Sequence, residues 1–380
     1  MSAFEIVNKP VSEISQFLAQ FKAEVKETKF PGVYIIKFNP KTDAENPLVN
    51  HLRGLIFDSV KHQVLSVTYP VPVEYKDRDE HSQQEICTKL SQTDYVVHEA
   101  MDGTLIRVWW NPCTDCWSFS TNNMEDAHTA YWMNSVSFGE LFRNALPPDF
   151  EFGKLHKNCV YFFTLCHPLN VIVVNHTLPS LYHVATFDLE QMHEIETDIG
   201  IQRPRCFDNM TVEEVRESIT ECHSKPVYSA GYMLVQKTQP HQLVKRYRFE
   251  NCNYTKARAL RGDSNNIYYT VLGYMLDPDN SKIRDFLTFY PVYIPVHAQL
   301  CDYFNATVKS LLHEYVQFYI LHKQVPILPR HADILEEIHT KVYLRKLRSI
   351  KKSMQIEHIG DHLRSLPTAK TLFLLNIHAQ

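Results

Sequence analysis

The feature that most constrains this chain is a change in its hydrophobic pattern near residue 255. Before that point, short apolar runs rich in Val, Ile, Tyr and Phe recur about every ten residues between turn residues, a pattern typical of half-buried strands. Helical spacing interrupts these runs at residues 11–26, 125–143 and 211–222. We therefore expect the first part to be an α+β domain of antiparallel sheets rather than a regular βαβ alternation. The expected strands are residues 32–38, 54–58, 63–69, 95–101, 104–110, 116–121, 159–166, 171–175, 181–189, 232–237 and 241–247.

Beyond residue 255 the strand pattern gives way to helical spacing. Residues 297–323 carry apolar side chains three or four positions apart, which predicts an amphipathic helix. Further helical stretches are expected at 331–353 and, divided by a proline, at 361–377. We therefore expect a first domain of residues 1–254 and an all-α C-terminal domain of residues 255–380.

The composition narrows the class of protein. Lys and Arg number 39 and Asp and Glu number 43, so any nucleic-acid site must be a local patch rather than a global basic field. The nine cysteines, with no secretory pattern at the start of the sequence, are interpreted as reduced thiols. No apolar run approaches the ~18 residues of a membrane span. We expect a cytoplasmic protein that does not bind membranes.

The most informative segment is residues 95–106, in which an apolar strand enters Asp102-Gly103 and a second strand follows. On its own, an Asp-Gly pair between strands is typical of a hairpin turn. Other short motifs surround it in order, and they give the pair more weight. They are residues 51–58 (HLRGLIFD), 161–174 (YFFTLCHPLNVIVV), 230–234 (AGYML) and 243–247 (LVKRY).

In this order and at these separations, the motifs resemble those of ATP-dependent RNA ligases of the bacteriophage RNA ligase 1 type, within the covalent nucleotidyltransferase superfamily. The resemblance covers most of residues 30–250. It implies a nucleotidyltransferase domain of antiparallel sheets followed by a helical domain. It also implies a lysine, two residues before the Asp-Gly, that attacks ATP and passes AMP to an RNA 5′-phosphate. In that family two glutamates hold the ribose and a metal ion, and a final lysine pair neutralises the phosphates.

This sequence departs from that pattern at its charged positions. Ala100 stands where the nucleophilic lysine belongs, and Thr164 and Ala230 stand where the glutamates belong. Of the final pair, Lys245 is present and Tyr247 replaces its partner. Because a methyl group cannot attack a phosphate, Ala100 removes the covalent route.

We therefore predict a pseudoenzyme that binds RNA or RNA ends without covalent nucleotidyl transfer, with no intact catalytic residue, no cofactor and no metal site. The resemblance implies that the retained framework residues face the nucleotide site. These residues are Arg53, Asp102, Gly103, Thr104, Phe163 and Lys245.

Two alternatives stay open. The first is an active RNA ligase or nucleotidyltransferase with displaced catalytic groups, which would use ATP and Mg. Its substitute nucleophile would be His98, two residues before Ala100 and hence on the same strand face, although displaced by ~6–7 Å along the strand. The second alternative is a structural or protein-interaction role, such as a viral protein would have, that reuses the fold as a shape.

Two basic clusters are candidate RNA contacts, with a solvated surface as the alternative interpretation of each. The first lies on an expected helix within residues 341–352, which contain no acid, and the second lies at the domain junction with aromatic residues interleaved. Such a composition suits contact with a phosphate backbone and stacking of bases. The members of the first cluster are Arg345, Lys346, Arg348, Lys351 and Lys352, and those of the second are Arg246, Arg248, Lys256, Arg258 and Arg261.

Cys113 and Cys116 form the one CxxC motif of the sequence. A structural zinc site needs four ligands, and no second pair of suitable spacing accompanies them. The motif lies between two expected strands, so we interpret it as a hairpin turn.

Overall fold

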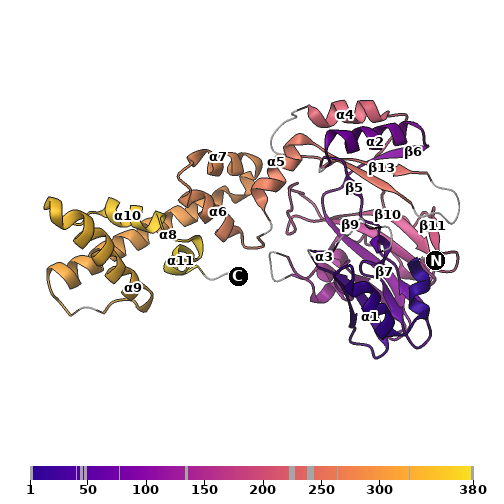
Figure 1. Ribbon diagram of the computed structural model, residues 1–380, viewed down its shortest axis with the longest axis horizontal. Coiled ribbons are helices and arrows are strands. Elements are labelled where there is room, and N and C mark those ends of the chain that lie inside the picture. Colours follow the sequence, from indigo (N-terminus) through magenta and orange to yellow (C-terminus); the bar gives the residue numbers. More distant parts are fainter. Residues whose placement is uncertain are drawn as a thin grey trace. The chain divides into compact units, whose positions relative to one another are not determined.

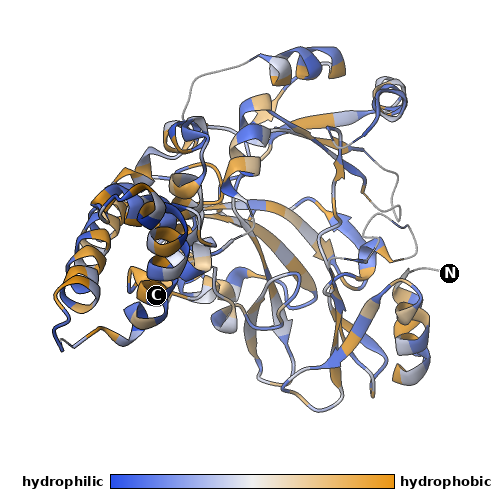
Figure 2. Ribbon diagram, turned by 60° about the vertical axis from the view of Figure 1, so that its left-hand side comes forward, coloured by the Kyte–Doolittle hydropathy of each residue, from blue (hydrophilic) through white to orange (hydrophobic). Residues whose placement is uncertain are grey.

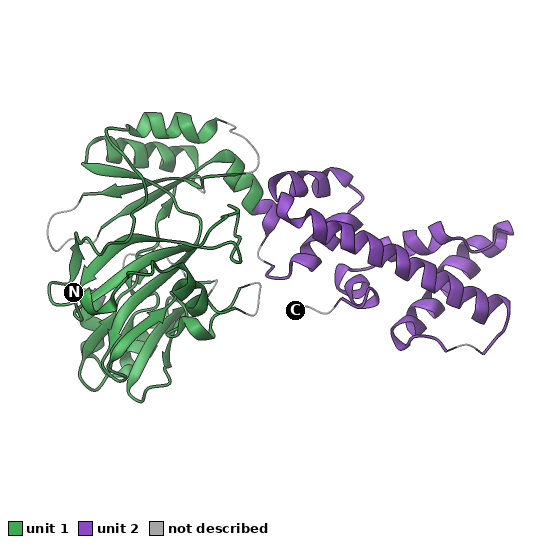
Figure 3. Ribbon diagram, turned by 180° about the vertical axis from the view of Figure 1, so that it is seen from behind, with its two compact units in different colours: residues 1–258 green, residues 259–380 purple. Residues whose placement is uncertain are grey.

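The computed structural model describes residues 3–377 apart from residues 40, 43–45, 47–48, 77, 133–135, 222–226, 238–243, 263 and 325. The chain divides into two compact units, Met1–Arg258 and Ala259–Gln380 (Figure 3). The division falls inside helix α5 (Cys252–Arg261) rather than at the expected residue 254. As the sequence predicts, the first unit is α+β with antiparallel sheets and the second is helical (Figure 1).

The strands of unit 1 form a four-stranded sheet and two five-stranded sheets. Every pairing among them is antiparallel except that of β5 with β14. The first sheet has the order β1 (Ala23–Glu27), β2 (Val33–Phe38), β3 (Ile56–Asp58), β4 (Gln63–Ser66). The second has the order β11 (His193–Ile195), β10 (Ser180–Asp188), β9 (Cys159–Cys166), β7 (Thr104–Asn111), β8 (Cys116–Ser120). The third has the order β12 (Cys206–Phe207), β6 (Tyr95–Glu99), β13 (Gly231–Gln236), β14 (Arg246–Glu250), β5 (Val73–Glu74).

Both faces of the second sheet are used in packing. Alternate residues of a strand point to opposite faces, so Val160, Phe162 and Thr164 of β9 share one face. Val160 and Phe162 pack against the first sheet. Phe163 points the other way, into a core that includes residues of helix α3 (Phe138–Ala145). Thr164 is therefore left on the face that the first sheet covers only in part.

Helices α2 (Glu80–Ser91) and α4 (Val212–Thr220) cover the outer face of the third sheet. Val97, Leu234 and Tyr247 point into this core beneath the two helices. Thr211 begins α4 with a capping box, in which the Thr211 hydroxyl accepts from the Glu214 amide and the Glu214 carboxylate accepts from the Thr211 amide. The inner face of the sheet is left to line a cleft.

Three local predictions for unit 1 are wrong. Of the helix expected at 125–143, only the 3-10 turn Ala127–Thr129 and the start of α3 are helical among the described residues. The helix expected at 11–26 ends early, as α1 (Val11–Ala19), because the backbone turns at Lys22 (φ 59°) and the residues after it pair with β2 as β1. The strand expected at 171–175 is a loop. Its amides at Val173 and Val174 donate to the Asp102 carboxylate, so they are not available to a strand ladder.

Unit 2 consists of short helices around one long one, and the helices predicted at 297–323, at 331–353 and on either side of Pro367 are confirmed. Leu300, Phe304 and Val308 bury one stripe of the long helix α8, and Figure 2 shows apolar and polar residues on different sides of such helices. No helix in the described ranges has the length and apolar character needed to cross a membrane. The elements are α6 (Ile267–Leu276), α7 (Asn280–Phe289), α8 (Ile294–Tyr315), π-helical η6 (Val316–Ile320), α9 (Pro329–Glu337), π-helical η7 (Ile338–Leu347), 3-10 helix η8 (Arg348–Ile350), α10 (Ile356–Arg364) and α11 (Thr368–Leu374).

Candidate functional site

A cleft of about 530 Å³ lies between the second and third sheets of unit 1. The inner faces of β6, β13 and β14 form one wall, and parts of β7, β9, β10 and β11 form the other. We call it the inter-sheet cleft. Ala100 lines this cleft, and the polar residues of the lining are Tyr69, His98, Glu99, Thr164, His183, Glu194, Glu196, Arg203, Gln236, Lys237 and Arg246.

The structure brings together three of the motif positions that the sequence singles out. Ala100 and Thr164 both line the inter-sheet cleft, one from each wall. The Ala100 amide donates to the carbonyl oxygen of Gly231 (2.9 Å), so the fourth motif lies directly beside the first. Ala230 itself is fully buried and does not line the cleft. The sequence motifs therefore converge on one place, although no acidic side chain stands at these positions.

In the last motif, the positively charged side chains that face the cleft side lie one residue later than the sequence predicted. Tyr247 points away from the cleft, into the core beneath α2 and α4, and Lys245 is an exposed residue that precedes β14. Because side chains alternate along a strand, Arg246 and Arg248 share the opposite face, which is directed toward the cleft side. The paired cations of this strand are thus arginines, not Lys245 with a Tyr247 partner.

Arg246 is held by an ion pair that spans the inter-sheet cleft. Its guanidinium donates to both carboxylate oxygens of Glu194 on β11 (3.0 and 2.5 Å). Its Cζ also lies 4.3 Å from the centre of the Tyr69 ring. Burial alone would lower the pKa of Arg246, but Tyr69 and Glu194 raise it above its ordinary value. The cation is therefore fully committed to partners within the protein.

Of the other charged side chains of the cleft, Arg203 and Glu196 pair with each other. Arg203 donates to Glu196 (2.6 Å), and no hydrogen bond or ion pair reaches the Glu99 carboxylate from any described residue. Among the described residues that line the cleft, Lys237 is the only lysine. Its amide donates to the carbonyl of Asp94, six residues before Ala100 on the neighbouring strand, which places it roughly 20 Å along the sheet from Ala100.

Two histidines of the inter-sheet cleft are neutral at pH 7. Burial lowers the pKa of His183 to about 4, and Arg203 adds to the effect. Burial and the same arginine also lower the pKa of His98. His98 and Ala100 both line the cleft, as does Glu99 between them.

The Asp102 carboxylate accepts hydrogen bonds from residues that are distant in the sequence. One carboxylate oxygen accepts from the Tyr254 hydroxyl (2.7 Å), and the other accepts from the amides of Val173 and Val174 (2.9 and 2.7 Å). Tyr254 follows Asp102 by 152 residues, so no local pattern could pair them. Asp102 therefore ties the loop after β9 and the start of α5 to the turn before β7.

The other framework residues lie around the cleft rather than on its lining. A Cβ on Gly103 would lie 2.4 Å from the carbonyl oxygen of Leu165, so this position requires glycine. Thr104 accepts a hydrogen bond from the Asn170 amide group (2.8 Å), and Phe163 faces the opposite core. Arg53 is half-buried, and burial lowers its pKa. Their contacts support the shape of the site.

The junction cluster does not form one exposed basic surface. Arg246 and Arg248 are held inside unit 1, and Arg261 is buried and donates to the carbonyl of Ser264 (2.8 Å). Arg258 pairs with Glu250 (3.0 Å), which leaves Lys256 as an exposed lysine. The expected patch is therefore corrected: most of its charges are neutralised within the protein.

The C-terminal cluster, in contrast to the junction cluster, is exposed. The side chains of Arg345, Lys346, Arg348, Lys351 and Lys352 are exposed on η7, η8 and the turn that follows. Within the described part of the chain, none of them forms an ion pair with an acid. We call these five residues the C-terminal basic patch.

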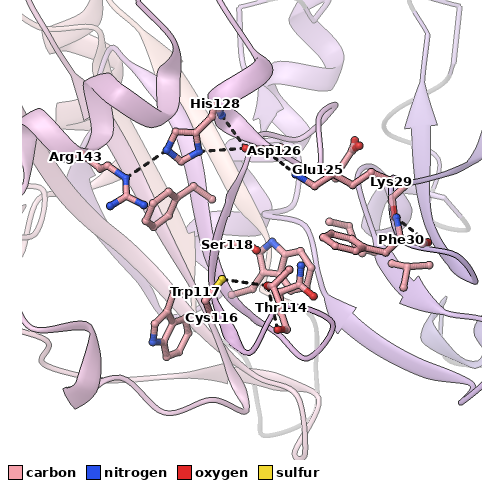
Figure 4. Close-up of a pocket in the computed structure, with 16 residues that line it drawn as sticks. Lys29, Phe30, Thr114, Cys116, Trp117, Ser118, Glu125, Asp126, His128 and Arg143 are labelled. Carbon is pink, nitrogen blue, oxygen red and sulfur yellow. Dashed lines mark hydrogen bonds and ion pairs between the residues drawn. The ribbon is translucent and has the colours of Figure 1, made fainter.

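A second, smaller cavity of about 220 Å³ lies between β2 and β3 of the first sheet and β7 and β8 of the second (Figure 4). Arg143, His128, Asp126 and Lys29 form a chain of interactions along it, with distances of 3.3, 3.1 and 2.8 Å. Each charged group in this chain already has a partner. The inter-sheet cleft, which has unpaired polar groups, is the better candidate for a ligand site.

The CxxC motif is the turn between β7 and β8, as predicted. The Asn111 side chain accepts from the Cys113 amide (2.9 Å), and Asp115 has a positive φ of 48°. In the ranges that the structure describes, no group of three or more His, Cys, Asp or Glu side chains is arranged to hold a metal ion.

Two viral proteins are similar in sequence to this chain. No family model matches it. The immediate-early protein ICP-46 homolog of Invertebrate iridescent virus 3 is 23% identical over 310 residues, which are 77% of this chain and 65% of that protein. The homolog of Invertebrate iridescent virus 6 is 26% identical over 127 residues, which are 33% of this chain and 27% of that protein. The chain thus spans less than two-thirds of the length of either relative.

RNA ligases are among the solved structures that are similar to this chain. An archaeal ATP-dependent RNA ligase has a TM-score of 0.45 and 13% identity, covering 74% of this chain and 72% of that chain. The Naegleria gruberi RNA ligase with PPi has a TM-score of 0.33 and 14% identity, covering 46% of this chain and 55% of that chain. Likenesses of this degree carry no argument about the activity of this chain.

Proposed function

We propose that this chain is a catalytically degenerate, RNA-ligase-like protein that binds RNA through its helical unit and performs no covalent nucleotidyl transfer. The observation that carries the proposal is the distance between Ala100 and the cleft lysine. Lys237 lies roughly 20 Å along the sheet from Ala100, whereas an attacking amine must lie within about 3–3.5 Å of the reacting phosphorus.

The electrostatics of the inter-sheet cleft support the same conclusion. Phosphoryl transfer depends on cations that stabilise charge on the phosphate oxygens. Arg246 forms a buried ion pair with Glu194, so this cation is not free for a phosphate, whereas the exposed pair of Arg203 with Glu196 holds its cation only weakly. Thr164 supplies no carboxylate for a metal ion.

Incubation of the full chain with α-labelled ATP or GTP and Mg²⁺, followed by a denaturing gel, tests the absence of covalent chemistry. We expect no labelled band. A labelled band would overturn the proposal.

The second candidate function, an active nucleotidyltransferase, is favoured by one observation. His98 lines the inter-sheet cleft beside Ala100, and its lowered pKa leaves the imidazole in the neutral form that attacks phosphorus. If a band forms and disappears in His98→Ala but persists in Lys256→Ala, this alternative replaces the proposal.

The C-terminal basic patch supports the RNA-binding part of the proposal. Five unpaired cations on one short stretch are suited to a phosphate backbone. Titration of a labelled single-stranded RNA across salt concentrations tests it. Each phosphate contact contributes about 0.7 to the slope of log K against log salt, so Lys346→Gln with Arg348→Gln is expected to lower that slope by about 1.4.

The matched control is Lys282→Gln with Arg364→Gln, which removes the same charge from the same unit. These two cations already pair with Asp277 (2.6 Å) and Asp361 (3.1 Å), so we expect an unchanged slope. An equal drop in both double variants would indicate net charge rather than a site. No RNA binding at low salt would favour the structural or protein-interaction role.

A further inference from the structure

Four aromatic side chains of unit 2 pack in sequence between η6 and η7. The rings of Tyr319 and His339 are nearly parallel, at 7°, and their centres are 4.0 Å apart. Tyr343 stacks on the same imidazole (5.5 Å, 24°), and Phe318 meets Tyr319 almost at a right angle (4.9 Å, 82°). We call these four residues the aromatic ladder.

The middle of the aromatic ladder is fixed from below by a buried residue of α8. The ring of Tyr315 lies 5.0 Å from that of Tyr319, and its hydroxyl is 3.0 Å from Nδ1 of His339. The rings are therefore ordered before any ligand arrives. A surface ordered in advance spends less of its binding energy on immobilising side chains.

The ends of the aromatic ladder are accessible. Phe318 is 44% exposed, and Tyr343 is half-buried. Ile320 and Leu321 beside η6 and Leu344 on η7 are also exposed. Large apolar side chains exposed on neighbouring elements mark a surface that binds a partner.

The C-terminal basic patch continues from the aromatic ladder along the chain. His339, Tyr343 and Arg348 follow one another at intervals of four and five residues, which suits one side of a helix with the wide π-helical turn. Burial lowers the pKa of His339, and the nearby guanidinium of Arg348 lowers it further. Burial raises the pKa of the Tyr319 hydroxyl, and the carboxylate of Glu336 raises it further. A phosphate chain is therefore attracted to the Arg348 end of the aromatic ladder.

We propose that unit 2 binds an internal stretch of unpaired RNA, with bases stacked on the exposed rings of Phe318 and Tyr343 and with phosphates on the C-terminal basic patch. The inference rests on the proposed function, because it requires that RNA binds through the helical unit. Unpaired bases can be splayed onto aromatic side chains, whereas a duplex keeps its bases stacked inside the helix. Ring faces and phosphates occur all along a strand, so this site needs no chain end.

Fluorescence anisotropy of the full chain with four labelled ligands of equal length tests the inference. They are a linear single strand, a covalently closed circle of the same sequence, a duplex, and an abasic strand that keeps every phosphate. We expect the linear strand and the circle to bind equally, and both to bind about fivefold tighter or more than the abasic strand and the duplex. Equal binding of the abasic strand or the duplex, or weaker binding of the circle, would overturn the inference.

Variants of the accessible rings locate the contact. Phe318→Leu and Tyr343→Leu are each expected to weaken binding of the linear strand about fivefold, with little change for the abasic strand. The matched control is Phe373→Leu, which removes an exposed phenylalanine from another helix of the same unit, α11. Because Phe318 is exposed, its variant keeps the test valid if Tyr343→Leu fails to fold. An equal loss in Phe373→Leu, or the same loss for the abasic strand, would overturn the inference.

The salt dependence separates this inference from the proposed function. Loss of a stacked ring releases no phosphate contact, so Phe318→Leu is expected to keep the salt slope that Lys346→Gln with Arg348→Gln lowers. Salt-dependent binding of all four ligands with equal affinity overturns only the present inference. Failure of every RNA to bind at low salt overturns RNA binding itself, and this inference with it.

Discussion

The ion pair between Arg246 and Glu194 provides the sharpest test of how unit 1 is held together, because it joins β14 of the third sheet to β11 of the second. Both contacts are charge-assisted hydrogen bonds, and the two side chains are only 3% and 17% exposed. The substitution Glu194→Gln removes the negative charge and keeps the shape. It leaves the guanidinium buried and uncompensated.

The expected cost follows from that burial. Removing one partner of a buried ion pair destabilises a protein by about 3–5 kcal/mol. The ring of Tyr69 stays 4.3 Å from Arg246 and retains a cation–π contact, so we expect the low end, about 3 kcal/mol. Removing both charges, as in Arg246→Met with Glu194→Leu, is expected to recover most of the loss, because no charge is left unpaired.

Urea denaturation followed by tryptophan fluorescence measures this loss. All four tryptophans of the chain, at 109, 110, 117 and 132, belong to unit 1, so the signal reports that unit. The control is Glu196→Gln, which breaks the Arg203 pair of the same cleft. That pair is 43% and 90% exposed, and exposed pairs contribute about 0–1 kcal/mol. A loss under 1 kcal/mol for Glu194→Gln, or equal losses for both variants, would refute the argument that burial sets the difference.

Three further outcomes are expected. Gly231→Ala should destabilise unit 1 by about 3 kcal/mol or more in urea titrations. The φ of Gly231 is +127°, and a Cβ there would lie 2.1 Å from a backbone oxygen of β14. The control is Gly153→Ala, since Gly153 has open space around it. Burial lowers the pKa of His183 from 6.5 to about 4, so stability present above pH 6.5 should fall by about 3 kcal/mol as the pH drops to 4, and His183→Gln should flatten that dependence. Tyr254→Phe removes a buried donor to Asp102 and should cost about 1–3 kcal/mol, and an unchanged denaturation midpoint would contradict this role.

Local periodicity predicted the long strands and helices but not the shortest or most uniform elements. Helix α2 buries few apolar residues, among them Cys87 and Leu90, so its stripe is too sparse to recognise. Helix α6 is apolar around most of its circumference (IYYTVLGYML), which hides the 3.6-residue period. The run 171–175 has the composition of a strand, but its amides are engaged by Asp102. A pattern that depends on neighbours in sequence cannot register such a partner.

The candidate site also has features that the sequence predicts and features that it does not. The motifs around Ala100, Thr164 and Gly231 can be found in sequence because each is a short run, and the fold places those runs together. The charges that determine what the cleft accepts were not found in advance. Glu194 is 52 residues from Arg246, and neither residue belongs to a recognisable short pattern with the other.

Local residue patterns determine the order of strands and helices and the break between an antiparallel α+β part and a helical part, because periodicity acts over a few positions. The absence of an amine on the side chain of Ala100 is likewise read directly from the sequence. Which cations are free was settled by folding. The side-chain alternation of β14 directs Tyr247 into a core and Arg246 toward Glu194, while the C-terminal basic patch forms no ion pair with any acid that the structure describes. Charge neutralisation depends on distance in space, and only the folded chain defines that distance.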